Sequence, residues 1–309
     1  MQDFPYTFRS NEAFKTVDDA SNWVKNEQDG IERTLRDHGA ILFRRFPIST
    51  AQDFDTFSGV FAYDDFTYEK SFSNAVRINL TPRVFTANEA PPDTEIFLHH
   101  ELAQTHHFPS KIFFCCLSAA DVGGATPICR SDLLFAEFRN QHPEWTQKFI
   151  DLGLKYTIQM PNENNYESGQ GRSWRSTFSV TSRTEAENRL AQLGYSWSWM
   201  EDQTLIATTP VMPAVRELPD GSVSFFNQVI AVSKGWRKRE GFPAPLTFGD
   251  GLPINDDILE ALTKISLRFT SALKWNSGDV ALVDNFRVMH GRHAYSGETP
   301  RQIIVNLAK

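Results

Sequence analysis

The sequence has few cysteines, no long apolar run and no segment that resembles a leader, and each absence narrows the possibilities. Only three cysteines occur in 309 residues, and two of them, Cys115 and Cys116, are neighbours, which is a poor basis for a disulfide framework. The longest apolar run, residues 112–117, is far shorter than a bilayer span, and residues 1–14 contain no charged stretch followed by an apolar one. We therefore expect a cytoplasmic protein that is not anchored to a membrane.

Positive charge is also sparse. The chain has 31 basic and 38 acidic residues, a net charge of −7, and its only dense basic group is Lys234, Arg237, Lys238 and Arg239. This balance argues against nucleic acid as a partner. Hydrophobic residues make up 40% of the chain and include 25 Phe and 7 Trp, enough to fill a sizeable globular core.

Short strand-like runs dominate the chain after an initial helical part. Helical spacing covers residues 20–37 and 50–61, and a short apolar run at 40–46 has the character of a buried strand. Ten further runs rich in β-branched and aromatic residues are separated by Pro, Gly and Asn, and they lie at 76–80, 84–86, 96–99, 111–117, 125–129, 152–159, 204–207, 223–226, 280–283 and 301–307. Helices are expected at 132–140, 183–193 and 256–269. Repeated strands without alternating helices predict a sandwich or a double-sheet barrel.

No repeat, low-complexity tract or linker divides the chain. We therefore expect one domain that spans residues 1–309. Residues 161–175, which are rich in Asn, Gly and Ser, are expected to form a long surface excursion of the kind that often serves as an active-site lid.

Three side chains suggest a metal site. Side chains two apart on a strand point the same way, so a strand through residues 96–102 would bring His99 and Glu101 to one face. His290, after another apolar run, would complete a set of two histidines and one carboxylate, which leaves positions open for Fe(II) chemistry. The tripeptide His-x-Glu also arises often by chance. The zinc-protease pattern H-E-x-x-H is excluded because position 104 is Gln.

Arg301 strengthens the metal hypothesis. On a strand at 301–307 it would share a face with Ile303, Val305 and Leu307, which directs a guanidinium into an apolar interior. A buried cation needs an anion, and a dicarboxylate cosubstrate would supply one. The alternative is an arginine on an edge strand in water.

Glu95 is a weaker candidate. It has the same strand parity as His99 and is expected to face the cavity, where it would pair with a substrate ammonium group. An equally simple interpretation is a solvated acid at the start of a strand.

Seven motifs together resemble the taurine dioxygenase (TauD/TfdA-like) family, in the same order along nearly the whole chain. They are GAILFRRF at 39–46, LHHEL at 98–102, GGATPI at 123–128, FNQ at 226–228, GDG at 249–251, WNSGDVALVDN at 275–285 and HGR at 290–292. The resemblance is greatest to the branch of amino-acid hydroxylases that includes the syringomycin-type aspartate hydroxylase and, more distantly, clavaminate synthase.

The resemblance implies a fold and a set of site residues. The fold would be mainly β with flanking helices, a double-stranded β-helix or jelly roll. His99, Glu101 and His290 would bind iron, and Thr126 and Arg301 would hold the distal carboxylate of 2-oxoglutarate. Asn227 and Arg175 lie in segments that resemble cavity-facing parts of the family, so Arg175 is a candidate for binding a substrate carboxylate.

Two positions bear on how this chain differs within the family. Residues 298–301 read Glu-Thr-Pro-Arg where the family commonly has an Arg-Arg pair, so a substrate anion bound elsewhere by the second arginine must be bound differently here. Glu101 favours oxygenation, because family halogenases have a small residue at that position.

The expected reaction is the hydroxylation of an unactivated C–H bond with Fe(II), 2-oxoglutarate and O2, and with release of succinate and CO2. The preferred substrate is a small polar molecule, an amino acid that is free or tethered to a carrier protein, in natural-product biosynthesis. Desaturation, cyclisation and epoxidation remain open. Two other classes also remain: a metal hydrolase or cupin, which would not need Arg301 and Thr126, and a non-enzymatic jelly roll, which would tolerate His99→Ala.

Overall fold

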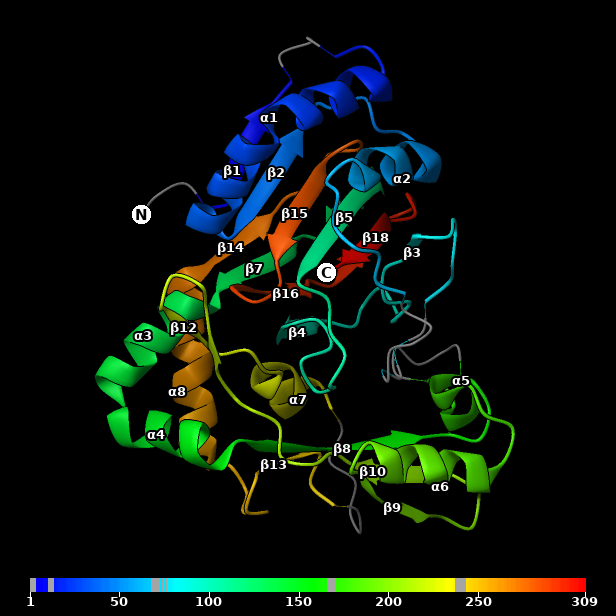
Figure 1. Ribbon diagram of the computed structural model, residues 1–309, viewed down its shortest axis with the longest axis vertical. Coiled ribbons are helices and arrows are strands. Elements are labelled where there is room, and N and C mark those ends of the chain that lie inside the picture. Colours follow the sequence, from blue (N-terminus) through cyan, green and yellow to red (C-terminus); the bar gives the residue numbers. More distant parts are fainter. Residues whose placement is uncertain are drawn as a thin grey trace.

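A computed structural model describes residues 4–10, 14–67, 73, 75, 77–165, 171–236 and 243–309. Two sheets at its centre carry most of the motifs (Figure 1). The larger has the order β1 (Tyr6–Arg9), β2 (Ala40–Arg44), β15 (Val280–Asp284), β5 (Lys111–Ser118), β18 (Gln302–Ala308) and β3 (Val84–Thr86). The smaller has the order β14 (Thr270–Leu273), β7 (Thr126–Arg130), β16 (Val288–Arg292) and β4 (Ile96–His99). Only β1 and β2 pair in parallel among these strands, so the core is an antiparallel β structure.

Strand β5 explains why the large sheet is covered on both faces. Its residues Ile112, Phe114 and Cys116 belong to the core on the inner side, while Phe113 and Cys115 belong to a second core on the outer side. This division follows from the alternation of side chains along a strand. A strand buried on both faces reads as one continuous apolar run, which is how it appears in the sequence.

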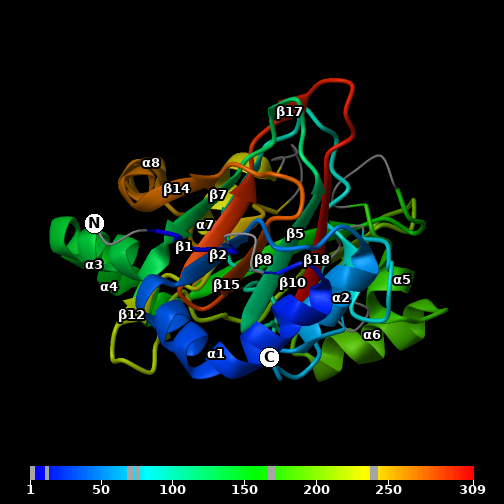
Figure 2. The ribbon, with the colours of Figure 1, turned by 90° about the horizontal axis from the view of Figure 1, so that it is seen from above.

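Helices α1 (Val17–His38) and α2 (Ala51–Gly59) cover the outer face of the large sheet (Figures 1 and 2). Both begin at a capping box: Thr16 with Asp19, and Thr50 with Asp53, each satisfy a backbone N–H that the first helical turn leaves unpaired. Gly39, with φ 78°, ends α1 and lets β2 begin one residue later.

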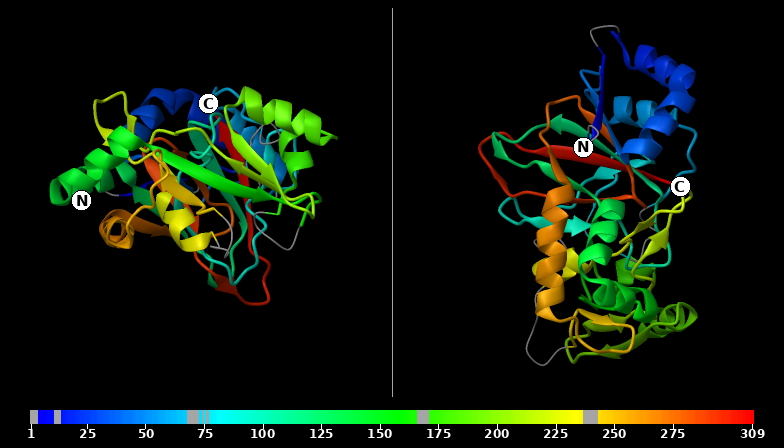
Figure 3. Two further views of the ribbon diagram at one scale, coloured as in Figure 1. Left: turned by 90° about the horizontal axis from the view of Figure 1, so that it is seen from below. Right: turned by 90° about the vertical axis from the view of Figure 1, so that its left-hand side faces the viewer.

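A second layer lies below the central strands in Figure 1. It contains the sheet β13 (Leu246–Phe248), β8 (Leu154–Met160), β10 (Leu205–Thr208) and β9 (Ser196–Trp199), packed against α5 (Trp174–Phe178) and α6 (Arg183–Gln192). Helices α3 (Ser131–Gln141), α4 (Pro143–Leu152), α7 (Val229–Gly235) and α8 (Asp256–Ser266), with the 3-10 turn Leu267–Phe269, join the layers. Figure 3, right, shows the orange α8 beside the green α3 and α4. Two short ribbons complete the fold: β11 (Arg216–Glu217) with β12 (Val223–Ser224), and β6 (Val122–Gly123) with β17 (Tyr295–Ser296).

Most expected elements are confirmed, and the differences are local. The expected strand at 76–80 is wrong where it is described, since 77–80 contains only an isolated bridge at Asn79, and residue 76 lies outside the described residues. Helices α4, α5 and α7 were not expected, nor were strands β1, β6, β9, β11, β13, β14, β16 and β17. In the predicted lid at 161–175, residues 166–170 lie outside the described part, as do Arg237, Lys238 and Arg239 of the basic group. No helix in the described ranges combines the length and apolarity needed to cross a membrane.

Candidate metal and cosubstrate site

Direct strand pairing brings two histidines together. Strands β4 and β16 are antiparallel neighbours in the small sheet, and their register places His290 opposite His99. The two imidazole rings lie 4.3 Å apart between centroids. The backbone hydrogen bonds between β4 and β16 thus hold two segments together that are far apart in the sequence, and they set which side chains are cross-strand neighbours.

Glu101 reaches the histidines by a different route from the one expected. Strand β4 ends at His99, and Glu101 lies in the following turn, where Leu102 has a φ of 60°. The strand-alternation argument for residues 99 and 101 is therefore wrong. The side chain of Asn285 fixes the turn, because its Oδ1 accepts from the Glu101 N–H at 2.8 Å and its Nδ2 donates to the Glu101 carbonyl at 3.0 Å.

The three side chains form a cluster that fits a metal ion. One ligand atom from each of His99, Glu101 and His290 lies within 4.8 Å of the other two. His290 Nε2 is 3.4 Å from Glu101 Oε2, and His290 Nδ1 is buried with no hydrogen-bond partner in the described structure. Two histidines and one carboxylate are the donor set of non-haem Fe(II) oxygenases, so the residues present fit that ion.

The electrostatics of the cluster favour the forms that bind a metal. Burial, and then the proximity of His290, lower the pKa of His99 to about 4, so His99 is neutral at pH 7. Its Nδ1–H donates to the Phe97 carbonyl at 2.8 Å, which leaves Nε2 as the free lone pair. Burial raises the pKa of Glu101, but Arg77 and the two histidines lower it more, and the carboxyl is held well below its usual range.

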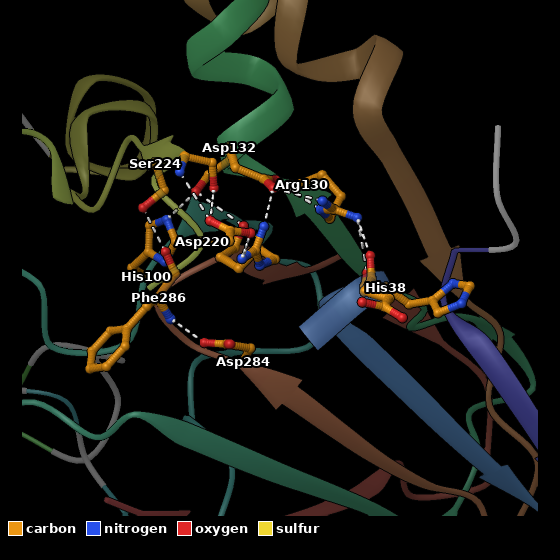
Figure 4. A network of polar contacts seen from close by, with 12 residues as sticks. His38, His100, Arg130, Asp132, Asp220, Ser224, Asp284 and Phe286 are labelled. Carbon is orange, nitrogen blue, oxygen red and sulfur yellow. Dashed lines mark hydrogen bonds and ion pairs between the residues drawn. The ribbon is translucent and has the colours of Figure 1, made fainter. Parts of the chain in front are cut away.

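His100 fixes the turn that carries Glu101 through hydrogen bonds on the side away from the cluster. It is fully buried, its Nδ1–H donates to the Asn285 carbonyl at 2.5 Å, and its Nε2 lies 2.8 Å from the Ser131 hydroxyl. Figure 4 shows His100 beside a network of charged side chains at the start of α3. In this network Asp132 accepts from Arg130 at 2.6 Å and from Arg287 at 2.7 Å, and Arg287 also pairs with Asp220. The network fixes the β15–β16 connection that carries Asn285.

A cavity of about 120 Å³ opens beside the cluster. Arg301 and Thr126 line it together with His99, Glu101 and His290, so all five side chains face one space. The Arg301 Nε–H donates to the Gly124 carbonyl at 2.9 Å, and its Nη2 lies 3.5 Å from Thr126 Oγ1, which also accepts from Trp275 at 3.0 Å.

Arg301 lies where the apolar alternation placed it. It sits one residue before β18, on the side of Ile303 and Val305, which also line the cavity. Burial, and then the nearby Arg292, lower the pKa of Arg301 to about 10, so it remains a cation at neutral pH. No acidic partner is found for it among the described residues. A buried cation of this kind needs an anion.

The three residues expected to contact the substrate lie elsewhere. Glu95 is half exposed and pairs with His293 at 3.2 Å. Arg175, on α5, donates to Asn162 and to the Thr181 carbonyl. The Asn227 amide is buried between the Ala214 carbonyl and the Val229 N–H. None of Glu95, Arg175 and Asn227 is among the described residues that line the cavity.

Four further polar side chains line the cavity that the sequence had not singled out as site residues. Arg77 forms a buried ion pair with Glu101 at 2.9 Å, and Arg292 donates to a group of backbone carbonyls in the loop before β4. Gln104 and Gln228 also line it and bond to each other at 2.5 Å. Arg292 and Gln228 lie inside quoted motifs, HGR and FNQ, but Arg77 lies in a loop with no motif around it.

Comparison with known proteins places the chain in a family. The model of the taurine catabolism dioxygenase TauD, TfdA family matches residues 5–307. A clavaminate synthase-like protein of Arabidopsis thaliana is 35% identical over 289 residues, which are 93% of this chain and 86% of the relative. Dapdiamide synthesis protein DdaC of Enterobacter agglomerans is 26% identical over 281 residues, 87% of this chain and 82% of that protein.

Solved structures agree on the fold. A taurine dioxygenase from Burkholderia xenovorans superposes with a TM-score of 0.51 at 16% identity, over 92% of this chain and 81% of that one. PvcB from Pseudomonas aeruginosa superposes with a TM-score of 0.53 at 13% identity, over 91% and 79%. These structures have the double-stranded β-helix that was expected. The chain thus belongs to the TauD/TfdA family, and the protein is a 2-oxoglutarate-dependent non-haem iron dioxygenase.

Proposed function

We propose that the protein hydroxylates an unactivated C–H bond of a small polar, amino-acid-like substrate in a biosynthetic pathway. In this proposal His99, Glu101 and His290 hold the iron, and Thr126 and Arg301 hold the distal carboxylate of 2-oxoglutarate. The observation that carries it is that a two-histidine, one-carboxylate cluster and a buried arginine without an acidic partner in the described structure line the same cavity.

Each proposed residue has a defined task. The bound iron supplies the activation of O2, in a reaction that consumes 2-oxoglutarate and releases succinate and CO2. His99 offers a neutral imidazole nitrogen, His290 offers a second imidazole nitrogen, and Glu101 offers an ionised carboxylate that its pKa keeps unprotonated. Arg301 can form a bidentate bond with a carboxylate, and the Trp275 bond orients the Thr126 hydroxyl beside it.

The substrate class is supported by the relatives. DdaC is named for dapdiamide synthesis, and PvcB is described as an Fe, alpha-ketoglutarate dependent oxygenase from an isonitrile synthetic pathway. Both descriptions are biosynthetic. A cavity lined by Arg77, Gln104 and Gln228 as well as by apolar residues suits a small polar molecule of the amino-acid kind. We extend the proposal to an amino acid that is free or tethered to a carrier protein.

The three cysteines support the expected cellular compartment. Cys115, Cys116 and Cys129 are all described, buried and free of disulfides. Buried free thiols are typical of proteins in a reducing compartment, and we propose a cytoplasmic location.

The test begins with cosubstrate binding. Fe(II) and 2-oxoglutarate are added anaerobically to the metal-free protein, and a visible metal-to-ligand absorption band is expected. Oxygen is then admitted with a panel of amino acids, and succinate and the oxidised product are followed by mass spectrometry. A gain of one oxygen atom identifies hydroxylation or epoxidation, and a loss of two hydrogens identifies desaturation or cyclisation.

Two outcomes would contradict the proposal. Absence of the band in the wild-type protein would exclude iron bound together with 2-oxoglutarate at this site. A band without any increase in succinate on addition of amino acids, free or on a carrier, would exclude the substrate class. His99→Ala should remove the band, and His106→Ala is a matched control because His106 is an exposed histidine outside the cluster.

A further inference from the structure

We infer that the side-chain amides of Gln104 and Gln228 form a binding site for an uncharged carboxamide group of the substrate. The inference rests on the proposed function. It goes further by naming the functional group that the substrate presents and the two residues that hold it.

The two glutamines lie on the wall of the cavity, beside the metal cluster. Gln104 follows Glu101 by three residues, and Gln228 immediately precedes α7. Both are buried, with exposed fractions of 4% and 7%. Ala231 and Trp236, in and directly after α7, line the cavity as well. Helix α7 packs against β4, as Figure 1 shows, so this wall adjoins the strand that ends at the first metal ligand.

Hydrogen bonds fix the orientation of both side-chain amides. Gln228 Nε2 donates to the His100 carbonyl at 3.2 Å and to Gln104 Oε1 at 2.5 Å. A backbone carbonyl can only accept, so the atom of the Gln228 amide that meets it has to be the nitrogen. The second bond of that nitrogen then requires the oxygen of Gln104, which determines the orientation of the Gln104 amide as well.

This orientation leaves one donor and one acceptor of the pair unused. Gln104 Nε2 and Gln228 Oε1 have no hydrogen-bond partner among the residues that the structure describes. Buried polar atoms are almost always hydrogen-bonded, and next to a cavity their partner is water or a ligand. A ligand that displaces such water gains affinity only if it reproduces the bonds that the water made. The pair therefore selects a group that accepts from Gln104 and donates to Gln228.

A carboxamide has the required donor and acceptor on one carbon atom. Its oxygen can accept from Gln104 Nε2 and its N–H can donate to Gln228 Oε1. A carboxylate has no hydrogen to donate, and an ammonium group has no lone pair with which to accept. Either charged group would leave one half of the pair without a bond, which costs more free energy than a missing contact between apolar groups.

The pair is distinct from the residues assigned to 2-oxoglutarate. Arg301 bonds to the Gly124 carbonyl and approaches Thr126, whereas the glutamines bond to each other and to the His100 carbonyl. The two sets come from different elements, so each can hold its own ligand. Because His100 lies between two metal ligands in the chain, a carboxamide held by the pair would bring the neighbouring C–H bonds of the substrate close to the cluster.

The test compares ligands that differ only in one terminal group. L-Asparagine, L-aspartate and L-leucine have side chains of similar shape that end in a carboxamide, a carboxylate and two methyl groups. L-Glutamine, L-glutamate and L-homoleucine form a second set, and succinamate with 4-methylpentanoate forms a pair without an amino group. Each compound is titrated by calorimetry into the anaerobic protein, with and without Fe(II) and 2-oxoglutarate. We expect the wild-type protein to bind at least one amide about 10- to 100-fold more tightly than its counterparts, the range for a buried polar group that loses its partner.

Two variants assign this preference to the glutamines. Gln104→Met replaces the amide by an apolar chain of similar length, so the apolar compound should then bind at least as tightly as the amide. Gln228→Met removes the unused oxygen and should have the same effect. A purely structural role of the pair would instead lower the affinities for all compounds alike. Thermal unfolding of each variant should be recorded.

Gln28→Met is the matched control. Gln28 is a partly buried glutamine on α1 whose Nε2 donates to the Phe61 carbonyl at 3.5 Å, and it is not among the described residues that line the cavity. The substitution is the same as in Gln104→Met, and it also removes a hydrogen bond to the rest of the protein. Preference among the compounds in Gln28→Met should equal that of the wild type.

Several outcomes would overturn the inference. If the members of every set bind the wild type equally, or if no compound binds, the unused atoms of the pair bond only to water. If Gln104→Met and Gln228→Met keep the preference, other residues select the amide. If they weaken Fe(II), 2-oxoglutarate and all compounds alike, the pair only ties the turn after β4 to α7. If L-homoserine binds more tightly than the amides, the group that the pair selects is a hydroxyl.

The remaining outcomes separate the inference from the proposed function. An amide preference in a protein that never forms the visible band would support the glutamine site and contradict the proposed role of iron. A band without an amide preference would do the reverse. A preference confined to succinamate would exclude the amino-acid class while the glutamine site stands.

Discussion

Two clusters of buried charge lie close together in this molecule and differ in how their charges are balanced. In the network at the start of α3, Asp132 bonds to Arg130 and Arg287, and Arg287 continues to Asp220, so acids and cations satisfy one another (Figure 4). In the cavity, Arg301 has no acidic partner in the described part of the chain, and His290 has an unpaired buried nitrogen. The charges of the first cluster pair with one another, whereas the second leaves a cation and a ring nitrogen without partners among the described residues.

This difference indicates that the first cluster contributes mainly to the stability of the fold and the second mainly to ligand binding. A buried ion pair that is complete within the protein loses stability when one partner is removed, because the other charge stays buried. A buried polar group whose partner is a ligand lowers the stability of the ligand-free protein. Substitution of such a group therefore affects ligand binding rather than stability. Substitutions in the two clusters should therefore affect different measurements.

The largest effect is expected for His290→Ala. Loss of one of three ligands should abolish the visible band and lower substrate-dependent succinate release at least about 1000-fold, since the metal supplies most of the rate acceleration. The free energy of unfolding of the metal-free protein, measured in urea, should fall less than in Asp132→Ala, because His290 Nδ1 already lacks a partner there and the polar contact that is lost is the 3.4 Å approach of Nε2 to Glu101. A variant that keeps the band, or that loses stability as Asp132 variants should, would remove the distinction between the clusters.

Asp132→Ala should produce the opposite pattern. It leaves the guanidinium groups of Arg130 and Arg287 without their shared acid, and the free energy of unfolding should fall by about 3–5 kcal/mol. The folded fraction should still form the visible band. Glu137→Ala is the control, because Glu137 pairs with the exposed Arg268 and its loss should not be detectable in the same urea titration. Equal effects of the two substitutions would contradict the prediction.

Arg301→Ala should affect only one ligand. The dissociation constant for 2-oxoglutarate, from titration of the band, should rise about 100-fold, because a buried charge-assisted bond is lost. Saturating cosubstrate should restore the band, and Arg301→Lys should bind with intermediate affinity. An undiminished affinity in Arg301→Ala would exclude Arg301 as the cosubstrate residue.

The smallest effect concerns acid stability. Burial raises the pKa of Asp132, but Arg130 and Arg287 lower it more, so its folded pKa lies below the unfolded value of 3.8. Such a carboxylate contributes stability above pH 3.8, and the contribution is lost as the pH falls through its folded pKa. Urea unfolding at a series of pH values should show a decline below about pH 4 that is shallower in Asp132→Asn. Identical slopes would mean that Asp132 is not the group that titrates.

Much of the fold could be predicted because its strands are either alternating or wholly apolar. Runs such as Lys111–Ser118 and Val280–Asp284 are recognisable from composition alone, since strands covered on both faces cannot carry many polar residues. Strand β16 escaped prediction because Val288–Arg292 carries His, Gly and Arg, the residues of the site, in place of an apolar pattern. Helix α7 is only seven residues long, too short for a helical period to emerge.

The sequence predicted those site residues that lie in or beside a family motif. His99, Glu101, His290, Thr126 and Arg301 lie in or next to family motifs, and the structure brings all five to one cavity. The route by which Glu101 arrives was not predictable, because it depends on bonds from Asn285, which is distant in sequence. Arg77 could not be found either, since no local pattern shows that a loop arginine will turn inward to meet a carboxylate.

The pairing of His290 with His99 has a consequence for the life of the protein in the cell. A nascent chain that has emerged only as far as the turn after β4 exposes His99 and Glu101, while the strand that carries the third ligand has not yet emerged. The nascent polypeptide therefore lacks the complete three-residue cluster, which forms only once β16 has been made. Assembly of the site therefore requires contact between segments that are far apart in the sequence, and contacts of this kind slow folding.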